Sequence, residues 1–226
     1  MLKEQIDSIK AAIKAKALSC GRNPEEIKLI AVTKRVDVDR ISEAIYSGIT
    51  IIGESYIQEA TPKIQALSGM KASWHFIGHL QSNKAKYAVK LFDLIHSVDS
   101  FKLAQSINNA AKKISKVQNI LIQINIGMED SKSGIYEEDA ISLVKEVSVL
   151  PNISVKGLMA IPPYFDEPKD VIPYFIKLSD LFKKVKEIPN ILMTELSMGM
   201  SHDFEIAIEY GATMVRVGTA IFGERA

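Results

Sequence analysis

The sequence has a single cysteine, Cys20, and this scarcity excludes an internal disulfide. Chains without disulfides are typical of a reducing compartment, so we expect a cytoplasmic protein. Long apolar runs are also missing, because no stretch reaches the roughly 18 residues that a membrane-spanning helix needs. No block of like charges occurs, and the formal net charge is only +1. The charge balance therefore indicates neither a nucleic-acid partner nor an anionic membrane surface.

The first 18 residues mix lysines and acids with apolar residues at helical spacing. Leu2, Ile6, Ile9, Ile13 and Ala17 would share one face of a helix. The segment has neither the continuous apolar run nor the cleavage signature of a signal peptide. We predict an amphipathic helix that covers the protein core, and binding to a membrane surface is the alternative.

Short apolar runs recur eight times, and helical patterns lie between most of them. The runs are KLIAVT, TIIGE, WHFIG, LIHSV, NILIQIN, SVKGLMAI, MTELSM and MVRVG. The longest helical patterns are FKLAQSINNAAKKI, EEDAISLVKEVSVL and VIPYFIKLSDLFKKVKEI, whereas Gly48 and Gly211 follow two shorter ones as helix-ending glycines. Apolar strands that alternate with helices are typical of a parallel sheet covered on both faces.

Eight such units predict an α/β fold, namely a (β/α)₈ TIM barrel with an extra N-terminal helix. The length of 226 residues suits one barrel, and no linker rich in proline, glycine or serine divides the chain. We therefore predict a single domain over residues 1–226. A doubly wound open sheet is the alternative, but no GxGxxG sequence opens a helix after the first strand.

Lys34 follows the first predicted strand, at the end of the barrel where active sites gather. A lysine at a strand end is often only a solvated side chain. The alternative is an amine sheltered enough to lower its pKa, and such an amine is a nucleophile for carbonyl groups.

The loops after the last two predicted strands have the composition of a phosphate site. In barrels these two loops often bind phosphate. Gly199 and Gly218 allow close approach of backbone N–H groups, and Ser201 and Thr219 supply hydroxyls. A helix expected to begin near Ser201 would point its free N–H groups at the loop, although Ser201 could equally serve as a plain helix cap. Together with Lys34, the pattern indicates a phosphorylated aldehyde as ligand.

Two further features allow both structural and functional interpretations. Arg216 lies inside the last strand, where it could pair with a barrel carboxylate such as Glu54 or Glu195, or donate to a ligand in the barrel mouth. His75 and His79 lie four residues apart, but no third metal ligand is spaced near them. We predict structural roles for these histidines and no metal site.

Six stretches resemble the pyridoxal phosphate homeostasis proteins, which are single-domain relatives of the alanine racemase N-terminal barrel. They are AVTK, IIGESYIQE, WHFIGHLQSNK, INIGMEDSKSG, GLMAIPP and ELSMGMSHDFEIAIEYGATMVRVGTAIFGER. The resemblance runs from about residue 29 to residue 225, and its longest piece, residues 195–225, is the most specific.

The resemblance implies a role for each matching residue toward pyridoxal 5′-phosphate (PLP). Lys34 would hold PLP as a Schiff base, and Arg216 would lie beside the pyridine nitrogen. The remaining positions would bind the phosphate or lie near the ring: Ser201, Gly218 and Thr219 for the phosphate, and Met159 and Met198 for the ring. Ser55 matches a cofactor-contacting position at which the family usually carries asparagine.

The resemblance implies PLP binding and delivery in vitamin B6 homeostasis, without robust catalysis. An arginine beside the pyridine nitrogen disfavours its protonation and weakens the ring as an electron sink. Racemases need a second base opposite the lysine, and none of Tyr56, Tyr87, Tyr136, Tyr164 and Tyr174 is an evident candidate. We expect a monomer that meets PLP-dependent client enzymes transiently. A low-activity amino-acid racemase and a cofactor-free aldolase acting on a sugar phosphate are the alternatives.

Overall fold

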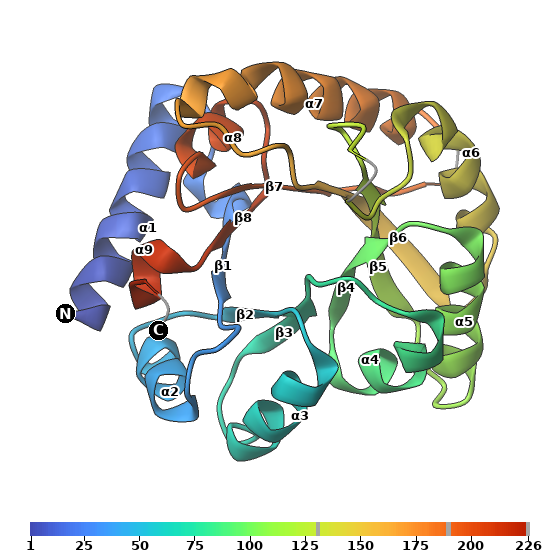
Figure 1. Ribbon diagram of the computed structural model, residues 1–226, viewed down its shortest axis with the longest axis horizontal. Helices are drawn as coiled ribbons and strands as arrows, with labels where there is room; N and C mark the ends of the chain where they lie inside the picture. The colour runs from blue at the N-terminus through green and yellow to red at the C-terminus, as the bar shows by residue number, and fades with distance from the viewer. Residues whose placement is uncertain (130–131, 189–190, 225–226) are drawn as a thin grey trace.

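The computed structural model describes residues 1–129, 132–188 and 191–224, and its strands form a closed parallel barrel (Figure 1). Each strand pairs with the next, and β8 pairs with β1 to close the ring. The strands are β1 (Lys28–Val32), β2 (Ile51–Glu54), β3 (Ser73–Phe76), β4 (Leu94–Val98), β5 (Gln118–Ile124), β6 (Ile153–Ala160), β7 (Glu195–Met200) and β8 (Met214–Val217). All eight predicted strands and the predicted barrel are confirmed.

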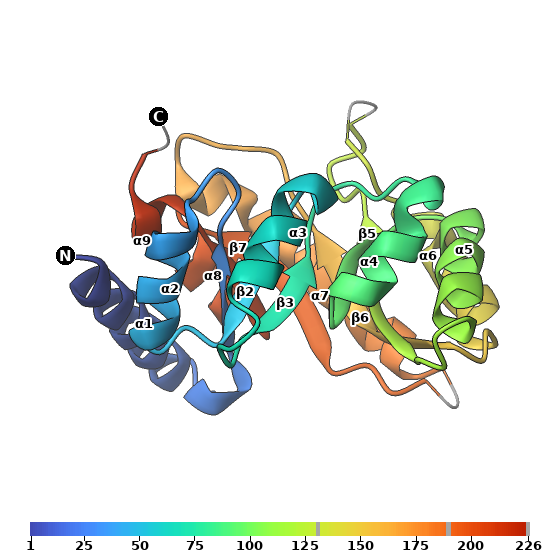
Figure 2. The ribbon, with the colours of Figure 1, turned by 90° about the horizontal axis from the view of Figure 1, so that it is seen from below.

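Helices surround the barrel on its outside, as both views show (Figures 1 and 2). The helices are α1 (Leu2–Ser19), α2 (Val38–Tyr46), α3 (Ile57–Ala66), α4 (Ala85–Leu91), α5 (Phe101–Lys112), α6 (Glu137–Ser148), α7 (Ile172–Lys186), α8 (Phe204–Glu209) and α9 (Thr219–Phe222). Short 3₁₀ turns occupy Pro24–Glu26, Ser82–Lys84 and Pro168–Val171. None of the helices in these described ranges has the length and apolar character to cross a membrane.

The N-terminal helix α1 covers the core, as the spacing of its apolar residues predicts. Its five apolar positions from Leu2 to Ala17 are all buried. The helix packs against α8 and α9 and lies beside them in Figure 1. Within a folded protein, packing of the apolar face provides most of the stability of an amphipathic helix, so this contact explains why the segment is helical.

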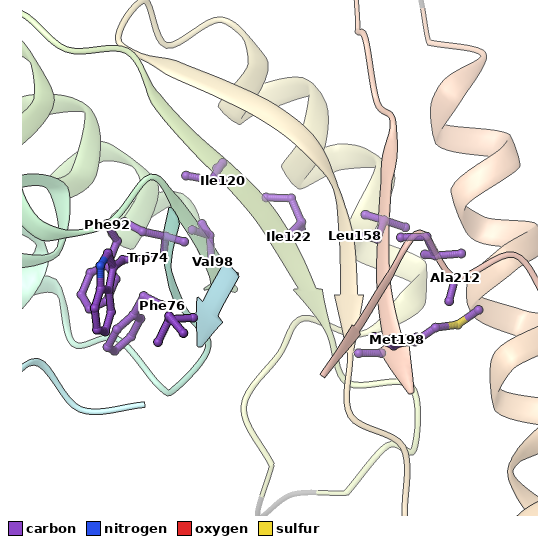
Figure 3. Packing of buried hydrophobic residues seen from close by; sticks show 14 of the residues in the cluster. Trp74, Phe76, Phe92, Val98, Ile120, Ile122, Leu158, Met198 and Ala212 are labelled. Atoms are coloured by element: carbon purple, nitrogen blue, oxygen red, sulfur yellow. The ribbon is translucent and has the colours of Figure 1, made fainter. Parts of the chain in front are cut away.

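The apolar core has two parts, one on each side of the barrel wall. The larger part lies between the strands and the outer helices and includes Trp74, Phe76 and Phe92 (Figure 3). The smaller part consists of Ile30, Leu94, Leu121, Met159 and Met214, and these residues face the barrel interior. Side chains alternate between the two faces of a strand, which assigns neighbouring residues to different parts of the core.

Glycines stand where the barrel brings two backbones together or where a helix must end. A Cβ on Gly157 of β6 would lie 1.6 Å from the carbonyl oxygen of Glu195 on the paired strand β7. Gly48 and Gly211 have φ values of +89° and +102°, which glycine adopts without a steric penalty. Their prediction as helix-ending residues is confirmed.

The helix predicted to begin near Ser201 begins three residues later, at Phe204. It is only six residues long, and its N-terminal flanking residue is Asp203. Asp203 Oδ1 accepts a hydrogen bond from the Met200 backbone N–H at 2.6 Å, which closes a turn ahead of the helix. Ser201 therefore lies in a loop and is not the cap of α8.

Candidate cofactor site

A cavity of about 550 Å³ opens at the carboxyl ends of the strands. Its walls come from the segments that follow β1, β2, β3, β5 and β6, and from side chains at the ends of β3 and β5. The lining residues are Lys34, Ser55, Tyr56, Ile57, Gln58, Phe76, Ile77, Gly78, His79, Leu80, Gln81, Lys84, Gln123, Lys132, Ser133 and Ile161. Two predicted site residues, Lys34 and Ser55, are therefore brought together in one cavity. Among the described residues that line it, several are lysines or amides and none is a carboxylate.

Lys34 is half-buried and lies two residues beyond the end of β1. The register of β1 against β8 places Ala31 opposite Val217. The turn that carries Lys34 and the loop that begins at Gly218 consequently leave the sheet side by side. This register brings the predicted amine and the predicted phosphate loops to the same edge of the barrel mouth.

The loops after β7 and β8 meet at the hydroxyl of Ser201. Ser201 Oγ accepts hydrogen bonds from the backbone N–H groups of Gly218, at 3.2 Å, and Ala220, at 3.4 Å. Gly218 is buried, whereas Thr219 and Ala220 are exposed. Two convergent N–H donors beside two hydroxyls can bind the oxygens of a phosphate, since such groups position anions without any charged side chain.

Arg216 is buried in the barrel interior, but its partners differ from both predicted carboxylates. Its Nη1 donates to Ser197 Oγ at 2.6 Å, and its Nη2 donates to the carbonyl oxygen of Ala160 at 2.9 Å. Glu54 pairs with Lys63, and Glu195 pairs with Lys28. Burial lowers the pKa of Arg216 to about 10, so the guanidinium keeps its charge at neutral pH.

Two histidines extend the hydrogen-bonded chain from Arg216 across the barrel. His96 Nδ1 lies 3.1 Å from Ser197 Oγ, and its Nε2 lies 3.1 Å from His75 Nδ1. Burial lowers the pKa of His75 to about 4 and holds the pKa of His96 well below its ordinary value. Both imidazoles are therefore neutral at neutral pH, so each can donate at one nitrogen and accept at the other.

The two predicted ring-contacting methionines lie on opposite sides of the barrel wall. Met159 is fully buried in the barrel interior, below the mouth. Met198 packs in the outer core near Ala212, as Figure 3 shows. The prediction for the Met198 side chain is wrong. Because side chains alternate along a strand, the inward position of Ser197 turns its neighbour Met198 outward.

The cavity and the hydrogen-bonded chain from Arg216 to His75 include residues that were not predicted from the sequence as site residues. Tyr56 lines the cavity at the start of α3, and Gln123 lines it from β5. His96 and Ser197 link Arg216 to the rest of the interior. A polar pair inside the apolar run LIHSV is a signal for His96, since buried polar side chains need partners. Within the described ranges no group of three or more histidine, cysteine or acidic residues could hold a metal ion.

The sequence profile of the alanine racemase N-terminal domain matches residues 6–226. The fold agrees, because an alanine racemase from Clostridium difficile 630 has a TM-score of 0.74 over 99% of this chain and 56% of that chain. The sequences are only 17% identical, so this likeness concerns the barrel alone. This chain is therefore a barrel of the alanine racemase N-terminal type.

Closer relatives define the family within that class. The pyridoxal phosphate homeostasis protein of Aquifex aeolicus is 43% identical over 222 residues, which cover 98% of this chain and 97% of that protein. PipY of Synechococcus elongatus, solved with PLP bound, is 32% identical, with a TM-score of 0.87 over 99% of this chain and 100% of that chain. The chain belongs to the pyridoxal phosphate homeostasis protein family, and the resemblance seen in the sequence is confirmed.

Proposed function

We propose that this protein binds PLP and buffers or delivers it in vitamin B6 homeostasis, through a single domain that spans residues 1–226. Lys34 bonds the aldehyde carbon, and the loops with Ser201, Gly218 and Thr219 hold the phosphate. Condensation of the amine with the aldehyde releases one water molecule, and hydrolysis reverses it. The observation that supports the proposal is the register of β8 on β1, by which the turn that carries Lys34 and the loop that begins at Gly218 leave the sheet as neighbours.

The residues around Lys34 fit the other parts of the cofactor. Arg216 is a buried donor on the inward face of β8, between the phosphate loop and the barrel interior. A guanidinium that stays protonated cannot transfer a proton to a pyridine nitrogen and leaves it as an acceptor. Ser55 lies in the same cavity as Lys34 and can donate or accept through its hydroxyl. PLP supplies the reactive aldehyde, and these residues bind and orient it.

We propose binding and delivery without robust catalysis of its own. The curated relatives are named for homeostasis, and the Arg216 guanidinium opposes the electron withdrawal on which PLP catalysis depends. Tyr56 does line the cavity, and it is the tyrosine to replace if a panel of L- and D-amino acids reveals racemisation. The lone Cys20 supports a cytoplasmic setting, in which a monomer would meet client enzymes transiently.

The test is a visible absorption spectrum of the purified protein after addition of PLP. We expect a visible band that borohydride removes. Mass spectrometry should then map the reduced adduct to Lys34. A protein that stays colourless at saturating PLP contradicts the proposal. Robust turnover of amino acids would contradict its non-catalytic part.

Replacement of Ser201 by alanine should weaken phosphate binding without affecting the aldehyde. We expect the Kd for PLP to rise about 10-fold to 100-fold, the order of one hydrogen bond to a charged group. Pyridoxal, which lacks the phosphate, should bind the variant and the wild type equally. Isothermal titration with both vitamers measures this, and Ser106→Ala is the matched control, since the Ser106 hydroxyl donates only to the Lys102 carbonyl oxygen within α5. An equal loss for both vitamers would place Ser201 outside the phosphate site.

A further inference from the structure

A cluster of one buried lysine, one buried glutamate and one half-buried glutamate contacts the turn that carries Lys34. Lys63 Nζ, on α3, lies 2.8 Å from Glu54 Oε1 and 2.6 Å from Glu59 Oε1. Lys63 is only 6% exposed and Glu54 is fully buried. Isolated buried charges are costly, and removal of one partner of a buried pair leaves the other charge uncompensated.

The cluster contacts the residues on both sides of Lys34. On the N-terminal side, Thr33 Oγ1 donates to Glu54 Oε1 at 2.6 Å, and the Thr33 carbonyl oxygen accepts from Lys63 Nζ at 2.7 Å. On the C-terminal side, the Arg35 backbone N–H donates to Glu59 Oε1. The backbone before and after the reactive lysine is therefore held by the same three side chains.

The backbone at this turn has a conformation that its sequence does not favour. Arg35 has a φ of +59°, in the left-handed region that residues other than glycine rarely occupy. Such a conformation persists only where surrounding contacts impose it. Two hydrogen bonds hold it here, the bond from the Arg35 N–H to Glu59 and the bond from the Val36 N–H to the Thr33 carbonyl oxygen.

We propose that Lys63 is a positioning residue, which with Glu54 and Glu59 holds the strained turn and thereby aims the Lys34 amine at the aldehyde. The inference rests on the proposed function, because it concerns the direction of the amine that bonds PLP. Reaction of an amine with a carbonyl depends steeply on alignment, and a small misplacement lowers the rate and the affinity. The polar contacts of the cluster reach the β1 turn on the aldehyde side of the mouth, so its effect should be confined to that end of the cofactor.

The experiment compares two phosphorylated vitamers on the full chain. PLP carries the aldehyde, whereas pyridoxine 5′-phosphate has the same ring and phosphate but carries an alcohol there and cannot bond Lys34. Glu59→Ala and Lys63→Met should each raise the Kd for PLP about tenfold and leave the Kd for pyridoxine 5′-phosphate unchanged. Lys116→Met is the matched control, since Lys116, like Lys63, donates to the backbone, here to the carbonyl groups of Val89 and Phe92 away from the site.

A second substitution tests the role of the turn itself. Glycine adopts a positive φ readily, so Arg35→Gly in the Glu59→Ala background should recover most of the lost PLP affinity. Equal loss for both vitamers, or no recovery in the double variant, would overturn the inference. Glu59 is 27% exposed at its side chain, so Glu59→Ala carries the test even where Lys63→Met fails to fold.

Amide hydrogen exchange of the protein without PLP separates this inference from the proposed function. The Arg35 amide should exchange faster in Glu59→Ala than in the wild type, since its acceptor is lost. Unchanged exchange would overturn the positioning inference. If the wild type binds both vitamers alike, the proposed bond to Lys34 is wrong, and the exchange rates still decide whether the cluster holds the turn.

Discussion

Replacement of Lys34 by alanine is expected to abolish the visible band of the PLP-loaded protein and to prevent the borohydride-reduced adduct. Lys34 lines the mouth cavity, and no other residue of the β1 turn can supply an amine. The phosphate loops remain intact in this variant, so weak binding should persist. We expect the Kd for PLP to rise roughly 100-fold, equivalent to about 2.7 kcal/mol. Absorbance titration and equilibrium dialysis measure the two effects.

Lys84→Ala is the matched control for this prediction. Lys84 lines the same cavity and also carries a primary amine, but it follows β3 rather than β1. Its replacement should leave the band and the adduct unchanged. An adduct that maps to Lys84 or Lys132, or a band that survives in Lys34→Ala, would contradict the assignment of the amine.

Borohydride trapping with a different ligand separates the proposed function from its rival, a cofactor-free aldolase. Such an enzyme would also use Lys34 and a phosphate site, because its substrate is a phosphorylated carbonyl compound. Borohydride in the presence of a sugar phosphate would then trap an adduct on Lys34 in the absence of PLP. We expect no adduct from the sugar phosphate. We expect an adduct from PLP, and because of the phosphate loops it should form at lower concentrations of PLP than of pyridoxal.

The barrel and the edge at which the site lies are predictable from the sequence, because both depend on local periodicity. Each apolar run in the sequence corresponds to one strand, and the residues after the run form the loop at the carboxyl end of that strand. Parallel strands of a barrel all end on the same side, so strands that alternate with helices place their following loops together. The loop residues Lys34, Ser201 and Gly218 can therefore be assigned to one end of the barrel from the amino-acid pattern alone.

The direction of individual side chains is not predictable in the same way. Met198 is expected near the ligand because it precedes the phosphate loop, yet the inward position of Ser197 turns it outward. A shift of one residue moves a strand side chain to the other face of the sheet. An apolar run in the sequence does not by itself say which of its residues face inward. Arg216 contacts Ser197 and Ala160 and neither of the carboxylates considered from the sequence, because contacts across a barrel depend on register.

The positioning cluster cannot be recognised in the sequence because its parts look ordinary. Glu59 and Lys63 are four residues apart on α3, which is the spacing of a common surface ion pair. The burial of Lys63 follows from the contacts of α3 with the turn after β1, and these contacts depend on the tertiary structure rather than on the local sequence. The left-handed φ of Arg35 is equally hidden, since arginine gives no sign of such a conformation.

The buried histidine pair predicts a large loss of stability in mild acid. The pKa of His75 is lowered by burial to about 4 in the folded state, against an ordinary value of 6.5. Between these values the unfolded state binds more protons than the folded state, so the free energy of unfolding falls as the pH falls from 6.5 to 4. The difference in pKa corresponds to roughly 3 kcal/mol for His75 alone.

His96 adds to this effect in the same direction, because burial also holds its pKa well below the ordinary value. Glu54 acts in the opposite direction, since burial raises the pKa of its carboxyl group and protonation in acid relieves that cost. The contribution of His75 is therefore isolated best by a difference between two proteins. His75→Gln removes the titrating group and keeps a hydrogen-bonding side chain beside His96.

Urea unfolding of the wild type and His75→Gln at pH 7 and at steps down to pH 4 tests this prediction. Stability of the wild type should fall by roughly 3 kcal/mol more than that of the variant over this range, because only the wild type must keep His75 neutral inside the barrel. His202→Gln is the control, since it changes an exposed histidine and leaves the buried pair intact. If the free energies of unfolding of the wild type and His75→Gln change equally with pH, His75 is protonated in the folded state without a loss of stability. The chain from His75 to Arg216 would then not depend on neutral imidazoles.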